Sequence, residues 1–141
     1  MSLKYLLDTN VISELRRPRP DENVVRWFAD QEISRVYLSA VTVGEINRGI
    51  ERLSTGKSKA HLQTWLEELR LKFAGRIFPV TDQTFSLWGK MYAEAERKGH
   101  TKPILDLLLE ATAVEHDLIL VTRNVRNFQH SSVTILNPWE D

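Results

Sequence analysis

The sequence predicts an α/β fold: a central, mostly parallel sheet of four to five strands with helices on both faces. Short apolar runs alternate along the chain with longer segments whose apolar residues recur at helical spacing. The run at 118–121 is so apolar that both of its faces should be covered, as in a parallel sheet. With 141 residues, of which 42% are hydrophobic, the chain is long enough for a single domain, 1–141, with its own core.

The first half of the chain should contain two strands and three helices. A strand at 4–7 leads into Asp8-Thr9-Asn10, which favour the cap of a helix that Pro18 and Pro20 end. The remaining elements are a short helix at 23–31, a strand at 36–38 and a helix at 40–53, broken by Ser54-Thr55-Gly56.

The second half continues the alternation. Its predicted elements are a helix at 61–73, a strand at 77–80, a helix from Thr81-Asp82 to near Gly99, a helix at 104–116, and strands at 118–121 and 133–136. Pro79 favours an edge or a strand end for the 77–80 segment, because proline cannot donate to a ladder. The last strand is also expected at an edge.

Three acidic residues lie where such a fold would bring them together: Asp8, Glu45 and Asp106. Asp8 ends the first strand, and parallel sheets bind ligands at the carboxyl ends of their strands. Each residue alone has a structural explanation, as a helix cap, a solvated helix residue or an acid favoured by the helix dipole. Together they predict an oxygen-rich pocket for a hard cation, Mg²⁺ or Mn²⁺.

The chemistry that suits this pocket is hydrolysis of a phosphodiester, because a divalent ion acidifies a bound water and stabilises charge on phosphoryl oxygens. Basic residues near the pocket are candidate contacts for substrate phosphates, and ordinary surface charge is the alternative. These candidates are Arg123, Arg126, Arg16 and Arg17, with Lys98 and Lys102 beside them. A phosphotransferase with Asp8 as nucleophile is disfavoured, because Asn10 stands where its general acid would be.

Composition excludes several classes. Lys+Arg and Asp+Glu both number 19, so no global basic field indicates a nucleic-acid partner, and any such binding must use local patches. The absence of cysteine excludes disulfides and thiolate metal sites. Neither a signal-peptide core nor a membrane-spanning apolar run is present in the sequence, so a cytoplasmic protein with no membrane partner is expected.

Four sequence blocks, spread from residue 4 to residue 139, together resemble the PIN domain, and more narrowly a VapC or FitB type toxin nuclease of bacterial toxin–antitoxin pairs. The blocks are 6–15, 42–46, Asp106 with 111–113, and 120–124, and the closing Asn137-Pro138-Trp139 looks like the FitB branch. The resemblance implies an α/β/α sandwich with Mg²⁺- or Mn²⁺-dependent endoribonuclease activity. It also implies a homodimer inhibited by a VapB/FitA-like antitoxin, with operator DNA bound only through that antitoxin.

By position, Asp8, Glu45 and Asp106 match the first three acids of that family. Members usually carry a fourth acid in the Thr-Arg-Asn loop. Possible auxiliary residues are Asn10, Thr122, the neutral Asn124 and Asn127 in that loop, and Glu110.

Glu110 lies one helical turn beyond Asp106, where it could face the same pocket or be solvated or antitoxin-facing. The loss of the fourth acid also leaves an alternative function: a catalytically weak or inactive PIN-fold protein that binds an antitoxin and supports its binding to operator DNA. Which RNA would be cleaved is not encoded in any motif.

Overall fold

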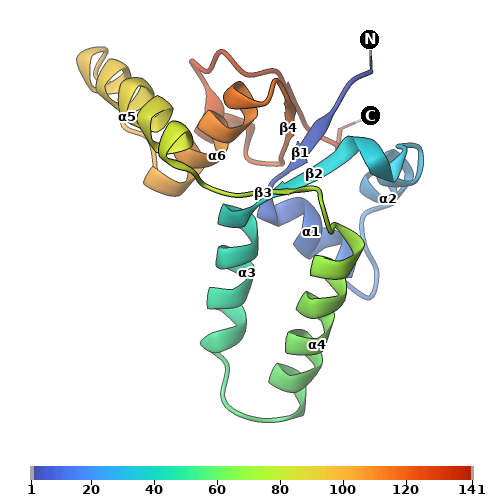
Figure 1. Cartoon of the computed structure of the whole chain (residues 1–141). Helices are drawn as coiled ribbons and strands as arrows, with labels where there is room; N and C mark the ends of the chain where they lie inside the picture. Colours follow the sequence, from blue (N-terminus) through green and yellow to red (C-terminus); the bar gives the residue numbers. More distant parts are fainter. Residues whose placement is uncertain (1, 141) are drawn as a thin grey trace.

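The computed structural model describes residues 2–140 and is built around one five-stranded parallel sheet (Figure 1). The strands are β1 (Tyr5–Leu7), β2 (Val36–Ser39), β3 (Ile77–Phe78), β4 (Ile119–Val121) and β5 (Ile135–Leu136). The helices are α1 (Thr9–Arg16), α2 (Glu22–Ala29), α3 (Ala40–Glu51), α4 (Lys57–Lys72), α5 (Asp82–Arg97) and α6 (Ile104–Glu115). Two short 3₁₀ turns, η1 (Ile33–Arg35) and η2 (Val125–Phe128), precede β2 and follow β4.

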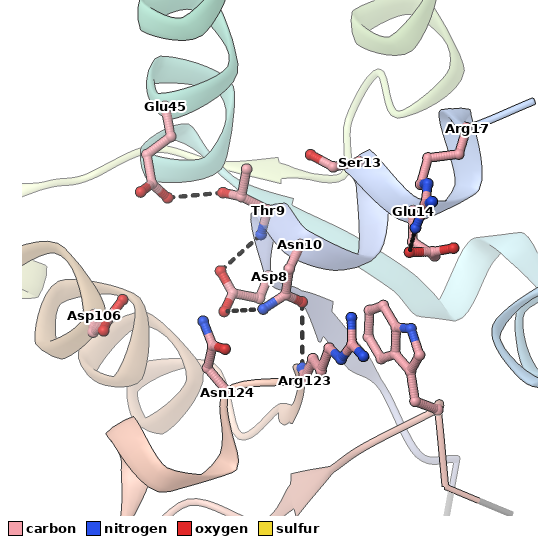
Figure 2. Close-up of a pocket in the computed structure, with 11 residues that line it drawn as sticks. Asp8, Thr9, Asn10, Ser13, Glu14, Arg17, Glu45, Asp106, Arg123 and Asn124 are labelled. Atoms are coloured by element: carbon pink, nitrogen blue, oxygen red, sulfur yellow. Dashed lines mark hydrogen bonds and ion pairs between the residues drawn. The ribbon is translucent and has the colours of Figure 1, made fainter. Parts of the chain in front are cut away.

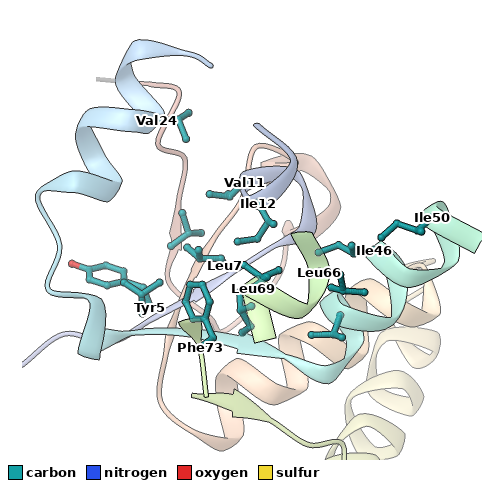
Figure 3. Packing of buried hydrophobic residues seen from close by; sticks show 14 residues of the cluster. Tyr5, Leu7, Val11, Ile12, Val24, Ile46, Ile50, Leu66, Leu69 and Phe73 are labelled. Atoms are coloured by element: carbon teal, nitrogen blue, oxygen red, sulfur yellow. The ribbon is translucent and has the colours of Figure 1, made fainter. Parts of the chain in front are cut away.

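Both faces of the sheet are covered, as predicted. Successive residues of a strand point to opposite faces, and β1 shows this directly: Tyr5 and Leu7 belong to one apolar cluster, whereas Leu6 belongs to another. The larger cluster packs α1 to α4 on the sheet and includes Phe73 (Figure 3). The smaller one packs α6 and η2, with Leu109, on the opposite face. The α/β/α sandwich expected from the sequence is therefore confirmed.

The strand order is β3-β2-β1-β4-β5, so the chain begins in the middle of the sheet. From β1 it first builds one side, through β2 and β3, and then returns to add β4 and β5 on the other side. The direction of winding therefore reverses between β1 and β4. In parallel sheets, the carboxyl ends of the strands at such a reversal leave a crevice between the diverging connections.

Most predicted elements are present, with different ends. The helix predicted from residue 61 begins at Lys57, because Gly56 caps it and no residue from Lys57 onwards interrupts it. The strand predicted at 77–80 stops at Phe78, before Pro79, and forms one edge of the sheet; β5 forms the other. Both edge predictions are confirmed. Among residues 2–140, no helix combines the length and apolar character that a bilayer crossing requires.

Candidate active site

A cleft of about 480 Å³ opens at the carboxyl ends of β1 and β4 (Figure 2). It is lined by acids, amides, two arginines and one tryptophan: Asp8, Thr9, Asn10, Ser13, Glu14, Arg17, Glu45, Asp106, Arg123, Asn124 and Trp139. The three acids singled out in the sequence come to this cleft from three elements. Asp8 follows β1, Glu45 lies in α3, and Asp106 lies in the first turn of α6.

Asp8 is the most buried of the three, with 6% of its surface exposed. It caps α1, since its Oδ1 accepts a hydrogen bond from the backbone N–H of Thr9 at 2.7 Å. Its Oδ2 accepts from the hydroxyl of Thr122 at 2.8 Å. Burial raises the pKa of the Asp8 carboxyl above its ordinary value, and these two hydrogen bonds oppose the rise in part.

Thr122 and Asn10, both predicted as auxiliary residues, hold Asp8 in place. The Thr122 hydroxyl donates to Asp8 and accepts from Asn10 Nδ2 at 3.1 Å and from the backbone N–H of Asn124 at 3.0 Å. These contacts use its whole donor and acceptor capacity. The other end of the Asn10 amide, Oδ1, accepts from the backbone N–H of Arg123 at 3.3 Å. The loop after β4 is thus tied to the start of α1.

Glu45 is half-buried and receives a hydrogen bond at 2.7 Å from the hydroxyl of Thr9 to its Oε1, drawn in Figure 2. Thr9 and Glu45 are 36 positions apart in the chain. Thr9 was not singled out from the sequence as a site residue, because a threonine directly after a helix cap is common at the start of a helix. Its backbone serves Asp8 while its side chain serves Glu45, so it links two of the acids.

Asp106 is also half-buried, and its Oδ2 accepts from Asn127 Nδ2 at 3.0 Å. Burial is the main reason that the pKa of Asp106 lies above its ordinary value. The negative charge of Asp8 raises it further, the hydrogen bond from Asn127 lowers it, and the charges of Glu45 and Glu110 add smaller increases. Asp106 therefore experiences the field of both Asp8 and Glu45.

The three acids surround the cleft without already forming a tight cluster. In the part of the chain that the structure describes, no three carboxylate or histidine groups are gathered closely enough to hold a metal ion. Within residues 2–140, Asp8, Glu45 and Asp106 also make no salt bridge. The cleft thus combines uncompensated carboxylates with room between them.

The four candidate arginines divide into two pairs. Arg123 and Arg17 line the cleft, whereas Arg16 and Arg126 are absent from its lining. Arg17 is engaged by Glu14, with a distance of 3.2 Å between Nη1 and Oε1. The guanidinium carbon of Arg16 lies 5.4 Å from the centroid of the Trp65 ring. Both residues line two other grooves of the protein.

Glu110 requires a correction. The alternatives of a solvated or pocket-facing carboxylate are wrong, because Glu110 is only 2% exposed and its Oε1 lies 3.1 Å from Lys102 Nζ. The pair lines a separate hollow of about 170 Å³ beside α5. Lys102 is therefore held inside the protein, since its side chain is only 9% exposed, and it is not a free phosphate contact. Lys98 is exposed and lies 3.8 Å from Glu94.

Besides Thr9, three cleft residues were missed from the sequence: Ser13, Glu14 and Trp139 as a site residue. Glu14 is 6% exposed, and its Oε2 accepts from the backbone N–H of Asp21 at 2.8 Å. The sequence does contain a pattern that could have identified Glu14. Asn10, Glu14 and Arg17 recur at the spacing of one helical face, so a polar stripe marks the side of α1 that faces the cleft.

The fold and the cleft define a class of protein: a parallel α/β/α sandwich with acidic residues at the carboxyl ends of its central strands. Residues 5–132 match the family model of the PIN domain. The chain belongs to the PIN-domain family, and the resemblance drawn from its sequence blocks is confirmed.

Similar proteins extend over nearly the whole chain. Toxin FitB of Neisseria gonorrhoeae is 40% identical over 96% of this chain and 99% of its own length. VapC ribonuclease Y4jK of Sinorhizobium fredii is 37% identical over 96% of this chain and 97% of its own length. The crystal structure of FitAcB from Neisseria gonorrhoeae matches 97% of this chain and 99% of its own, with a TM-score of 0.91 and 38% identity. The structure of FitAB bound to an IR36 DNA fragment matches 97% of this chain and 96% of its own, with a TM-score of 0.89 and 38% identity.

Proposed function

We propose that this protein is a metal-dependent endoribonuclease, a single nuclease domain that acts as the toxin of a toxin–antitoxin pair and hydrolyses phosphodiester bonds of RNA. The observation that carries the proposal is the convergence of Asp8, Glu45 and Asp106 from three elements on one open cleft. The names of similar proteins, a toxin and a VapC ribonuclease, support the same activity.

The donor set fits Mg²⁺ or Mn²⁺. All three acids offer hard carboxylate oxygens, and within residues 2–140 none of them is neutralised by a salt bridge. The raised pKa values of Asp8 and Asp106 reflect burial and, for Asp106, repulsion by its neighbours. A bound cation would offset both effects by favouring the ionised carboxylates. Asp8, Glu45 and Asp106 would hold the ion together with water molecules, because Mg²⁺ keeps several waters and these three carboxylates of the described chain do not form a closed cluster. When bound, it supplies charge stabilisation at the phosphoryl oxygens and acidifies water.

The other residues of the cleft orient the carboxylates or bind the substrate. Thr122 and Asn10 orient the Asp8 carboxylate, since Asn10 Nδ2 also donates to Asp8 Oδ2 at 3.4 Å, and Thr9 orients the Glu45 carboxylate. Arg123 lines the cleft and supplies a cation for a substrate phosphate beside the acids. Asn124 lines the cleft where family members often carry an acid, so it contributes a neutral amide in place of a fourth charge.

The proposed partners follow from the same relatives. The matched FitAcB and FitAB structures support a complex with a FitA-like antitoxin, and the second of them contains DNA. We extend this to a homodimer of the present chain that meets operator DNA only through its antitoxin. The proposal places the protein in the cytoplasm, where RNA and antitoxin are made. The alternative of a catalytically weak or inactive partner is less supported, because a close relative is named as a ribonuclease.

The test is cleavage of a total transfer-RNA pool by purified, antitoxin-free protein with Mg²⁺, Mn²⁺ or EDTA, beside Asp8→Asn. Cleavage with either ion, lost both in EDTA and in Asp8→Asn, is the expected result. Asp30→Asn is the matched control, because Asp30 is exposed at the end of α2 and does not line the cleft. A folded protein that cuts no RNA with either ion would contradict the proposal and leave antitoxin binding as the function.

A further inference from the structure

Arg123 and Trp139 form a cation–π pair at the side of the cleft. The guanidinium carbon of Arg123 lies 5.2 Å from the centroid of the Trp139 ring. Both residues line the same cleft as Asp8, Glu45 and Asp106, and Figure 2 shows Arg123 beside Asn10 on the side away from Glu45. An arginine over a tryptophan face is a favourable cation–π geometry, and it leaves the N–H groups of the guanidinium edge free to bind an anion.

Trp139 is itself firmly anchored. It is partly buried and packs against the larger apolar cluster. Its backbone carbonyl accepts from Asn23 Nδ2 at 2.9 Å, and its backbone N–H donates to Asn137 Oδ1 at 3.0 Å. The indole is thus a fixed surface, although it lies near the end of the chain.

Arg123 is held by contacts that leave its charge available. Its backbone N–H donates to Asn10 Oδ1 at 3.3 Å, which ties it to the network around Asp8. Within residues 2–140 its guanidinium lies within 4.0 Å of no carboxylate oxygen, whereas the other arginine of the cleft, Arg17, is paired with Glu14 at 3.2 Å. A long side chain loses rotamer freedom when it binds, and an aromatic platform removes part of that loss beforehand.

We propose that Trp139 is a positioning residue for substrate binding: its indole holds the Arg123 guanidinium at the cleft, where the guanidinium binds a backbone phosphate of the RNA. This inference rests on the proposed ribonuclease function and assigns the Asn137-Pro138-Trp139 segment a role in it. Trp139 acts through Arg123, and substrate contact is made by the arginine. The competing explanation is that Trp139 only fills the core and that Arg123 acts without it.

The experiment compares Trp139→Leu, Trp139→Phe, Arg123→Ala and the double variant Trp139→Leu/Arg123→Ala with the wild type. Cleavage of one fluorescein-labelled oligoribonucleotide of fixed transfer-RNA sequence, chosen independently of cleavage, gives KM and kcat in Mg²⁺. Fluorescence anisotropy with the same oligonucleotide in EDTA gives binding at several NaCl concentrations. Lys72→Ala is the matched control, since Lys72 Nζ lies 5.2 Å from the ring centroid of Phe28 and lines a different groove.

Arg123→Ala should raise KM and Kd roughly 10-fold through loss of one charge-assisted contact. It should also lower the slope of log binding against log salt by about 0.7, the value for one phosphate contact on a single strand. Trp139→Leu should raise KM about 3- to 5-fold with kcat nearly unchanged, and Trp139→Phe should stay within about twofold of wild type because it keeps a ring. The double variant should match Arg123→Ala alone, since the two residues act as a unit.

Additive losses in the double variant, or equal losses in Trp139→Phe and Trp139→Leu, would overturn the inference while leaving the nuclease in place. So would a Trp139→Leu variant whose loss appears only in kcat and in Tm, with the salt slope unchanged. If the wild type binds the oligoribonucleotide but does not cut it, only the proposed ribonuclease function is contradicted, because the anisotropy series still tests the role of Trp139. A wild type that neither cuts nor binds overturns both.

Discussion

The hydroxyl of Thr122 donates a hydrogen bond to Oδ2 of Asp8 across 2.8 Å, although 114 positions separate the two residues in the chain. Parallel pairing makes this possible, since β1 and β4 are neighbours with Leu7 opposite Val121. The residues that follow the two strands are therefore placed side by side at the winding reversal. Thr122 is fully buried, so Asp8 has a fixed donor inside the protein.

Thr122→Val should damage both stability and activity. Valine removes the donor to Asp8 and the acceptor of Asn10 and Asn124, and unsatisfied buried polar groups cost about 1–3 kcal/mol. The free energy of unfolding, from urea titration, should fall by about that amount, and RNA cleavage should fall with it. Thr122→Ser retains the hydroxyl and should recover most of the activity. If valine and serine variants cleave equally well, the hydroxyl does not hold Asp8 for the reaction.

Asn124→Asp should strengthen metal dependence. Asn124 lines the cleft, and a carboxylate there would add a fourth negative charge to Asp8, Glu45 and Asp106. Ligand charge tunes divalent-ion affinity, so the Mg²⁺ concentration for half-maximal cleavage should fall roughly 3- to 10-fold. Asn127→Asp is the contrasting variant. It replaces the donor to Asp106 at 3.0 Å with a like charge, so it should lower the stability of the metal-free protein. An unchanged Mg²⁺ requirement in Asn124→Asp would count against the metal proposal.

Asp106→Asn should raise stability at neutral pH while abolishing activity. The pKa of Asp106 lies above its ordinary 3.8, so the folded state disfavours the ionised form, and this cost is present at pH 7 and absent well below pH 3.8. In EDTA, Tm should therefore rise by about 1–2 °C at pH 7, and the gain should shrink as the pH falls through the folded-state pKa. Asp30→Asn serves as the control. A gain that is the same at pH 7 and pH 4 would show that the cost of ionising the buried Asp106 carboxyl is not its source.

The buried pair of Lys102 and Glu110 gives a prediction independent of the cleft. Lys102→Met should destabilise the protein by about 3–5 kcal/mol, because it leaves Glu110 charged, buried and without its partner. Lys102→Met/Glu110→Leu removes both charges and should return close to wild-type stability. Urea unfolding of the two variants measures the difference. Equal losses in the single and double variants would indicate that the pair matters for packing and not for charge.

Much of the fold follows from local sequence signals. Helical spacing of apolar residues, the caps at Asp8 and Thr81, and breaks at Pro18 and Gly56 each act within a few residues, so they could be recognised without the structure. Pro79 indicated an edge or a strand end for the 77–80 segment, and β3 has both properties. The convergence of Asp8, Glu45 and Asp106 on one cleft could be expected, because Asp8 ends a strand at the carboxyl edge of the sheet and the helices that carry the other two acids can reach that edge.

The partners of individual side chains were decided by the tertiary structure. Glu110 and Lys102 are both charged residues that a sequence places equally well in solvent, yet the packing of α6 encloses them as a pair. The hydrogen bond from Thr9 to Glu45 and the cation–π contact of Arg123 with Trp139 join residues well beyond one helical turn of each other in the chain. Periodicity and capping report only neighbours a few positions apart. Which distant groups meet depends on how the connections close around the sheet, and that closure is set by packing of the whole domain.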